Sequence, residues 1–194
     1  MNSLSLRFLP QAKAAEHIQT AYLAGGCFWC VEAVFRIIRG VLDITPGYAG
    51  GMTPHPTYES VSTGVTGHAE VIRVTYDPVV ISYEDILHIF FSAHDPTTHN
   101  RQGNDIGSQY RSAIFYTTSA EAAAAHAVIQ ELTTEKVFTA PIITEVQPLT
   151  QLHLAETYHQ NYYTKNPEAP YCAAVIPPKL AKIRKRYIKF AREQ

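Results

Sequence analysis

The chain has 194 residues, of which 46% are hydrophobic and 17% charged, a composition that excludes a disordered chain and supplies enough apolar mass for a core. Its mean hydropathy of -0.11 and the lack of a long apolar run exclude a membrane-spanning helix. The N-terminus shows no basic start followed by an apolar stretch, so we expect no secretory signal and a cytoplasmic location. We expect residues 1–16 to be a loosely attached lead-in and residues 17–194 to form a single domain.

The formal net charge of -1 conceals an uneven distribution. Seven of the 16 basic residues, but one of the 17 acidic residues, lie within 179–194, which puts that segment at about +6 and the remainder at about -7. We interpret the segment as a solvated basic helix, with docking of an acidic protein as the alternative. Nucleic acid is not expected as a partner, because no aromatic-studded basic groove accompanies the cluster.

The first part of the chain alternates strand-like and helix-like segments. Strands are indicated by alternating or short apolar runs, and a helix by apolar residues at helical spacing after a pair of glycines. A long stretch rich in Gly, Pro, Thr and Ser predicts a loop, and a loop of that length in a compact domain is usually functional. In chain order we predict a strand at 17–24, a helix at 27–38, a strand at 41–48, the loop at 47–67 and a strand at 68–76.

The second part repeats these patterns. Ser82 and Ser119 are well placed to cap two helices, and Pro177-Pro178 precede the basic final helix. We predict a helix at 83–93, a polar loop at 94–109, a strand at 110–117, a helix at 119–136, a strand at 142–149 and a short helix at 155–163. Together the elements predict an α+β two-layer sandwich, with a mixed, largely antiparallel sheet and helices packed on it.

The chain has three cysteines, Cys27, Cys30 and Cys172. Three is too few for a secreted scaffold held together by disulfides, and an odd number cannot all pair within the chain. Cys27 follows two glycines at the predicted start of a helix, where free backbone N–H groups and the positive end of the helix dipole favour a thiolate. Phe28 and Trp29 stand beside it and would form an apolar wall. The sequence therefore predicts a nucleophilic cysteine, the alternative being that all three side chains belong to the core.

The spacing Cys27-x-x-Cys30 leaves two other readings open. It matches the redox spacing of thioredoxin-like proteins, although Phe-Trp is a bulky pair for a general disulfide exchanger. A zinc site would need Cys172 and a histidine, and no second closely spaced ligand pair exists. The second hypothesis is accordingly a redox or metal-binding module without turnover of a small molecule, and it predicts no product release.

Candidate acids and phenols come from the two predicted polar loops and their borders. These are Tyr58, Glu70, Asp105 and Tyr110. If they face Cys27, the site combines a nucleophile, a carboxyl that stays protonated when buried and two phenol donors. Such a set suits attack on an electrophilic atom while a leaving oxygen is protonated.

Several short motifs, in order, resemble the A-class peptide methionine sulfoxide reductases over roughly residues 20 to 186. The segment Gly26-Cys27-Phe28-Trp29 resembles the signature of that family. The remaining motifs are Gly47-Tyr48-Ala49-Gly50-Gly51, Pro56-Thr57-Tyr58, Gly67-His68-Ala69-Glu70, His94-Asp95-Pro96, Gln102-Gly103-Asn104-Asp105, Gln109-Tyr110-Arg111-Ser112 and Tyr158-His159-Gln160. The resemblance implies a ferredoxin-like core and makes residues 17–194 a catalytic domain.

By this resemblance, Cys27 attacks the sulfur of methionine S-sulfoxide and becomes a sulfenic acid. Glu70 would protonate the sulfoxide oxygen. Of the other positions, Tyr58 and Tyr110 would hold that oxygen, Asp105 would orient donors or water, and Phe28, Trp29, His159 and Tyr162 would contact the substrate. A resolving thiol would then form a disulfide, which thioredoxin would reduce, and neither metal nor organic cofactor is implied.

Two departures from the family pattern concern the resolving thiol. The family commonly has glycine where this chain has Cys30, and many members carry two C-terminal cysteines where this chain has Cys172 alone. Cys172 follows Tyr171 in a proline-rich stretch, as a family resolving cysteine does. We therefore expect Cys172, in a surface segment, to resolve the sulfenic acid, with Cys30 as a possible relay thiol.

Overall fold

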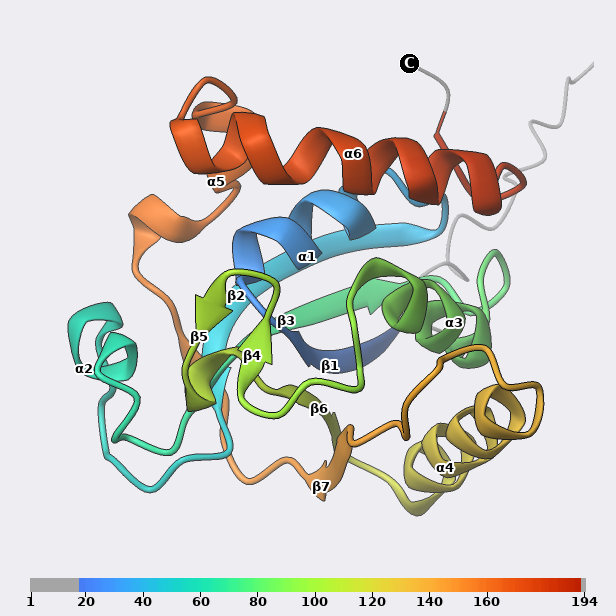
Figure 1. Cartoon of the computed structure of the whole chain (residues 1–194), viewed down its shortest axis with the longest axis horizontal. Helices are drawn as coiled ribbons and strands as arrows, with labels where there is room; N and C mark the ends of the chain where they lie inside the picture. The colour runs from blue at the N-terminus through green and yellow to red at the C-terminus, as the bar shows by residue number, and fades with distance from the viewer. Residues whose placement is uncertain (1–17, 193–194) are drawn as a thin grey trace, which may run out of the picture.

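The computed structural model describes residues 18–192 and is built on one six-stranded sheet (Figure 1). The strand order is β7-β6-β1-β3-β2-β8. These strands are β1 (Gln19–Gly25), β2 (Val41–Ala49), β3 (Ala69–Tyr76), β6 (Ser112–Tyr116), β7 (Glu145–Pro148) and β8 (His153–Leu154). A separate two-stranded hairpin pairs β4 (Arg101–Gln102) with β5 (Asp105–Ile106). The helices are α1 (Phe28–Arg36), α2 (Tyr58–Ser62), α3 (Tyr83–Ala93), α4 (Ser119–Thr134), α5 (Tyr162–Lys165) and α6 (Pro170–Arg186).

The central elements have the predicted α+β topology. The order β1-α1-β2-β3-α3-β6 in the chain, with β6-β1-β3-β2 in the sheet, is the arrangement of a ferredoxin-like fold. These four strands pair antiparallel throughout, and β7 adds a parallel strand beside β6. The prediction of a mixed, largely antiparallel sheet with helices packed on it is therefore confirmed.

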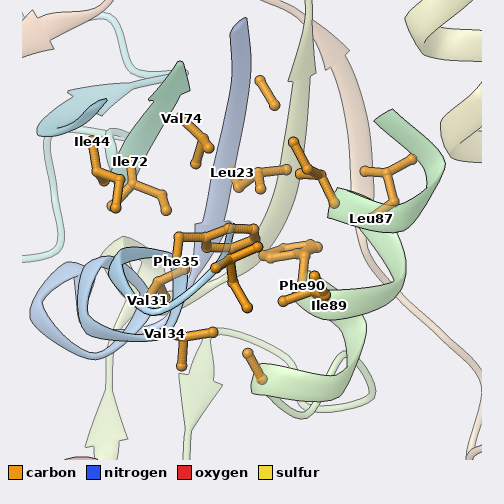
Figure 2. Close-up of a cluster of buried hydrophobic side chains, with 14 of the residues drawn as sticks. Leu23, Val31, Val34, Phe35, Ile44, Ile72, Val74, Leu87, Ile89 and Phe90 are labelled. Atoms are coloured by element: carbon orange, nitrogen blue, oxygen red, sulfur yellow. The ribbon is translucent and has the colours of Figure 1, made fainter. Parts of the chain in front are cut away.

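The main core lies between the sheet and the two helices α1 and α3 (Figure 2). Leu23 and Ile72 point from the sheet toward Phe35 of α1 and Phe90 of α3, and all four side chains are fully buried. The apolar spacing that predicted helix 27–38 thus marks a face that packs on the strands. Each such side chain contributes on the order of 1.5–3 kcal/mol through burial, so the core fixes where α1 begins.

Several loops and boundaries differ from the sequence prediction. The loop predicted at 47–67 begins inside β2 and contains α2, whose start is fixed by a capping box between Thr57 and Ser60. Strand 110–117 shortens to β6, because Tyr110 lies in a 3₁₀ turn, Ser108–Tyr110. Predicted helix 155–163 is a 3₁₀ turn, Thr157–His159, followed by α5. Thr118 rather than Ser119 caps α4, since its hydroxyl accepts from the Glu121 N–H.

The remaining boundaries agree with prediction to within a few residues. The polar loop 94–109 contains the β4–β5 hairpin, and the predicted strand 142–149 is the shorter β7. The predicted lead-in, residues 1–16, lies outside the described residues, as does His17 at the start of the first predicted strand. Within residues 18–192, no helix combines the length and the apolar character needed to cross a membrane.

The C-terminal helix α6 corrects two predictions. Pro177 and Pro178 lie inside this helix instead of preceding it, and Cys172 lies in its first turn with 0% of its surface exposed. Pro170 at the helix start is favoured there, while the two interior prolines lie on the exposed side, where water can satisfy the carbonyls they leave unpaired. The helix lies across α1 (Figure 1). Cys172 is therefore part of a packed element and not of a surface segment.

Candidate active site

Cys27 is the N-cap residue of α1 and is 8% exposed. Two glycines before it allow this position. At Gly25 a Cβ would come within 2.8 Å of the Phe90 ring, and Gly26 adopts a φ of +88° with the Gln102 side chain packed against it. The glycine pair thus lets the end of β1 pack closely between α3 and the β4–β5 hairpin, which places Cys27 at the start of α1.

Cys27 and Cys30 lie one helical turn apart, and their thiols interact. Burial, followed by the hydrogen bond with Cys30, raises the pKa of Cys27 well above its usual value. The same hydrogen bond lowers the pKa of Cys30 to about 7, against the opposing effect of burial. Burial and this hydrogen bond thus oppose the thiolate that the helix start alone predicted at Cys27, and they favour a negative charge on Cys30 instead.

Glu70 enters the site from β3 and is 3% exposed. Its carboxylate oxygen Oε2 accepts the Phe28 backbone N–H at 2.9 Å, which places the carboxyl at the first turn of α1 beside Cys27. Burial raises the pKa of Glu70 to about 8, despite the opposing effect of this hydrogen bond. The carboxyl is therefore protonated at neutral pH, which is the form that a general acid needs.

Tyr58 at the start of α2 and Tyr110 in the turn Ser108–Tyr110 are both close enough to this acid for its charge to affect them. Burial and then the charge of Glu70 raise the pKa of each phenol, and the charge of Cys27 adds to the effect. Tyr110 packs in the cluster that contains the three cysteines, and Tyr58 begins α2. Both phenols thus stay neutral and can donate a hydrogen bond.

An aromatic group lies on the other side of Cys27. Trp29 stacks on Tyr162 with ring centroids 3.8 Å apart and planes 9° apart, and its Nε1–H donates to His159 Nδ1 at 3.1 Å. The His159 ring lies 5.0 Å from Phe28 and 4.3 Å from Tyr58. Phe28 is fully buried and lies on the core side of this aromatic group. Trp29 and Tyr162 are half-buried and form the side of the group that is accessible from outside.

Two carboxylates that the sequence analysis did not select hold this aromatic group in place. Glu32, 1% exposed, accepts the Asn161 N–H at 2.8 Å and pairs with Arg36 at 2.7 Å. Asn161 has the left-handed φ of 58°, which a non-glycine residue adopts at a cost. Glu156 accepts the Tyr48 hydroxyl and the Tyr58 N–H, both at 2.8 Å. A glutamate within a helical apolar stripe was the only sequence signal for Glu32.

We expect Glu32→Ala to loosen the contact of Tyr162 with Trp29, because the turn before α5 loses its charged anchor. The KM for a sulfoxide substrate should rise about tenfold, the value of one hydrogen bond to a charged group. Trp29 is the only tryptophan, so its fluorescence should shift in parallel. Glu84→Gln, at an exposed carboxylate in α3, is the control. Unchanged fluorescence and KM in Glu32→Ala would contradict the anchoring role.

Cys172 joins the other two cysteines in one buried cluster with Ala33 and Ile176. All three cysteines are free thiols. The preceding residue, Tyr171, bridges this cluster to Asp105 of the hairpin, since its hydroxyl donates to Asp105 Oδ2 at 2.6 Å and lies 3.5 Å from Cys30 Sγ. The structure thus brings together every site residue predicted from the sequence, and adds Tyr171.

Residues 18–192 hold no group of three or more His, Cys, Asp and Glu side chains arranged to bind a metal ion. The site instead offers a thiol nucleophile, a protonated carboxyl, neutral phenols and two further thiols within one cluster. Attack by sulfur, protonation of a departing oxygen and disulfide exchange are the reactions this set can perform. Fold and site together define a thiol-based oxidoreductase.

Comparisons with known proteins identify the family. The family model described as "Peptide methionine sulfoxide reductase" matches residues 19–191. The peptide methionine sulfoxide reductase MsrA of Thermus thermophilus is 52% identical over 169 residues, covering 87% of this chain and 95% of that protein. The chain belongs to the peptide methionine sulfoxide reductase family.

Solved structures agree with this assignment. Methionine sulfoxide reductase A of Corynebacterium diphtheriae has a TM-score of 0.76 and 35% identity, covering 84% of this chain and 85% of that one. Mxr1 from Saccharomyces cerevisiae in complex with Trx2 has a TM-score of 0.54 and 25% identity, covering 76% of this chain and 86% of that one. The family resemblance read from the sequence motifs is confirmed.

Proposed function

We propose that this chain reduces methionine S-sulfoxide, free or in oxidised proteins, to methionine, with Cys27 as nucleophile and Glu70 as general acid. One observation carries the assignment of roles: a carboxyl with its pKa raised to about 8 is held at the first turn of α1, directly beside the Cys27 position. We further propose that residues 17–194 act as one catalytic domain. The three free thiols fit a reducing compartment, the cytoplasm.

The first step requires Cys27 as a thiolate, although its pKa is raised. Cys30, with a pKa of about 7, is the neighbouring base that accepts this proton. Glu70 protonates the sulfoxide oxygen while the Cys27 thiolate attacks the sulfoxide sulfur and forms a bond to it. The hydroxyl then passes from the substrate sulfur to Cys27 Sγ as the bond between Cys27 and the substrate sulfur breaks. Methionine leaves reduced, Cys27 carries a sulfenic acid and Glu70 is a carboxylate that takes its proton back from solvent.

Tyr58 and Tyr110 hold the oxygen as it passes from substrate to Cys27. Their raised pKa values keep both phenols protonated, so each offers an O–H to the developing charge. Trp29, Tyr162, His159 and, behind them, Phe28 form the apolar side that receives the S-methyl group. Substrate orientation then follows from polar donors on one side of Cys27 and aromatic rings on the other.

The resolving step is proposed to begin at Cys30. Cys30 lies one turn from Cys27, with its N–H donating to the Cys27 carbonyl at 3.0 Å, and its pKa is lowered to about 7, whereas burial raises the pKa of Cys172. Cys30 attacks the sulfenic sulfur and displaces water, giving a Cys27–Cys30 disulfide. Cys172 then attacks Cys30, so the disulfide moves to Cys30–Cys172 and Cys27 is released as a thiol. The proximity of all three thiols in one cluster supports this relay.

The cysteine relay predicts different stoichiometries without reductant. Wild type should release about two equivalents of methionine, because Cys27 is regenerated once, whereas Cys172→Ser should release about one and stop at a Cys27–Cys30 disulfide. Cys30→Ser should also release about one, more slowly because it lacks the base of the first step, and should keep a sulfenic acid that dimedone traps. Methionine release and peptide mapping by mass spectrometry measure these products. A direct Cys27–Cys172 disulfide forming in Cys30→Ser at the wild-type rate would contradict the relay.

Reduction of the final disulfide needs an external dithiol, for which we propose thioredoxin. The structural relative Mxr1 is seen in complex with Trx2, which supports a partner of this type. The test of the whole function is an assay on the separated sulfoxide epimers with dithiothreitol, and then with thioredoxin. Methionine should form from the S epimer, whereas a redox module without turnover would release none from either epimer.

A further inference from the structure

Tyr171 has no role in the steps given so far, yet it touches three parts of the site. Its hydroxyl lies 3.5 Å from Cys30 Sγ and donates to Asp105 Oδ2 at 2.6 Å. Its ring meets Trp29 edge-on, with centroids 6.0 Å apart and an interplanar angle of 73°. The side chain therefore connects the relay thiol to a carboxylate in the β4–β5 hairpin.

Counting protons gives this chain of contacts a direction. A phenol carries one proton and can donate it once. Because Tyr171 donates to Asp105, its oxygen can only accept toward Cys30, so the S–H is the donor in that contact once Cys30 carries the proton taken from Cys27. The hydrogen bonds then run from the Cys30 S–H to the Tyr171 hydroxyl and from that hydroxyl to the Asp105 carboxylate. A proton can move away from sulfur along this arrangement.

The proposed function leaves Cys30 needing this exit. Cys30 takes the proton of Cys27 in the first step, but attack on the sulfenic sulfur requires a thiolate. Glu70 lies beside Cys27, and the charge of Cys27 acts on the phenols Tyr58 and Tyr110. Cys30 instead has the hydroxyl of Tyr171 as a neighbour. Burial raises the pKa of Tyr171, so its phenol stays neutral and passes a proton without holding a charge.

We propose that Tyr171 and Asp105 form a proton relay that deprotonates Cys30 for the resolving step, an inference that rests on the proposed function. The Cys30 proton moves to the Tyr171 oxygen while the Tyr171 proton moves to Asp105. Cys30 attacks Cys27, the sulfur–sulfur bond forms and the sulfenic oxygen leaves as water after taking a proton from solvent. Cys30 is oxidised, the sulfenic sulfur is reduced and Asp105, half-exposed in the hairpin, returns its proton to solvent.

The relay can be tested in single-turnover reactions without reductant, following methionine release and disulfide formation in the same samples. Tyr171→Phe keeps the ring on Trp29 but removes the hydroxyl, and Asp105→Asn keeps an acceptor that cannot take the proton. In both variants, disulfide formation relative to methionine release should slow about 10²-fold, as for loss of a general base. Tyr163→Phe is the matched control, since it removes a phenol hydroxyl from the same cluster and should behave as wild type.

A thiolate titration separates the relay from a simple charge effect. In a Cys27→Ser, Cys172→Ser background, Cys30 is the remaining thiol and its ultraviolet thiolate absorbance reports its pKa. The charge of Asp105 raises the pKa of Cys30, so Asp105→Asn should lower it. Electrostatics alone would then speed the resolving step in Asp105→Asn, whereas the relay slows it.

Wild-type rates of disulfide formation in Tyr171→Phe, or faster resolution in Asp105→Asn, would overturn the relay while methionine release continues. No methionine from the wild type would overturn the proposed function together with the relay. The two failures are therefore distinguished by which of the two products is missing.

Discussion

Cys27→Ser is expected to reduce methionine formation to background. A serine hydroxyl is a far poorer nucleophile toward sulfur than a thiolate at neutral pH, and it cannot hold the sulfenic oxygen. The substitution replaces one small side chain by another at an 8% exposed N-cap position, where serine is itself a favoured residue. Loss of activity should therefore occur without loss of fold.

Methionine release from the S epimer and thermal unfolding together measure this expectation. Unfolding midpoints should agree within a few degrees, while the product falls below detection. Cys172→Ser, which changes the same atom in a fully buried thiol of the same cluster, is the matched control and should keep the first turnover. Turnover by Cys27→Ser at more than a trace of the wild-type rate would remove Cys27 as nucleophile.

Glu70→Gln is expected to slow methionine release in a single turnover by about 10²–10⁴-fold, the usual contribution of a general acid. Glutamine keeps an oxygen that can accept the Phe28 N–H but has no acidic proton for the sulfoxide oxygen. Wild-type activity should fall above about pH 8, where the carboxyl ionises. A rate for Glu70→Gln within about threefold of wild type would exclude this role.

The stability of the protein should depend on pH through the same carboxyl. The pKa of Glu70 rises from 4.5 to about 8 on burial, so the folded protein binds a proton that the unfolded chain releases. The free energy of unfolding of the wild type therefore decreases as pH rises through this window, by up to about 1.4 kcal/mol per pH unit. Glu70→Gln lacks this titration and should be less sensitive to pH. Denaturant unfolding at pH 5 and pH 8 measures the difference.

Much of the fold and most of the site could be predicted from two kinds of sequence information. These are the local patterns of apolar residues and glycines, and the order of the family motifs along the chain. Apolar spacing over 27–38 identified α1, and Gly25-Gly26 before Cys27 marked the junction of strand and helix. Glu70, Asp105 and Tyr110 come from three separate elements, and no spacing rule brings them together. The family resemblance supplied that grouping, and the structure shows how the sheet and hairpin achieve it.

The errors have physical causes that a local pattern does not contain. Prolines were expected to keep Cys172 at the surface, but Pro177 and Pro178 lie on the exposed side of α6 while Cys172 and Ile176 face α1. The thiolate was expected at Cys27 from the helix dipole, but burial and the neighbouring Cys30 outweigh the dipole. Glu32 and Tyr171 were not selected, because their importance lies in long-range contacts with Asn161 and with Cys30.

The two prolines inside α6 have a consequence for how often the oxidised enzyme can be reduced again. Pro177 and Pro178 have no N–H, so Ala173 and Ala174 lose their helical partners, and the turns carrying Cys172 are joined only weakly to the rest. A protein reductant can reach a fully buried sulfur only when this leading part of α6 lifts from α1. Reduction of the disulfide therefore requires local unfolding of this part of α6. Hydrogen exchange at residues 173–176 would report how often that unfolding occurs.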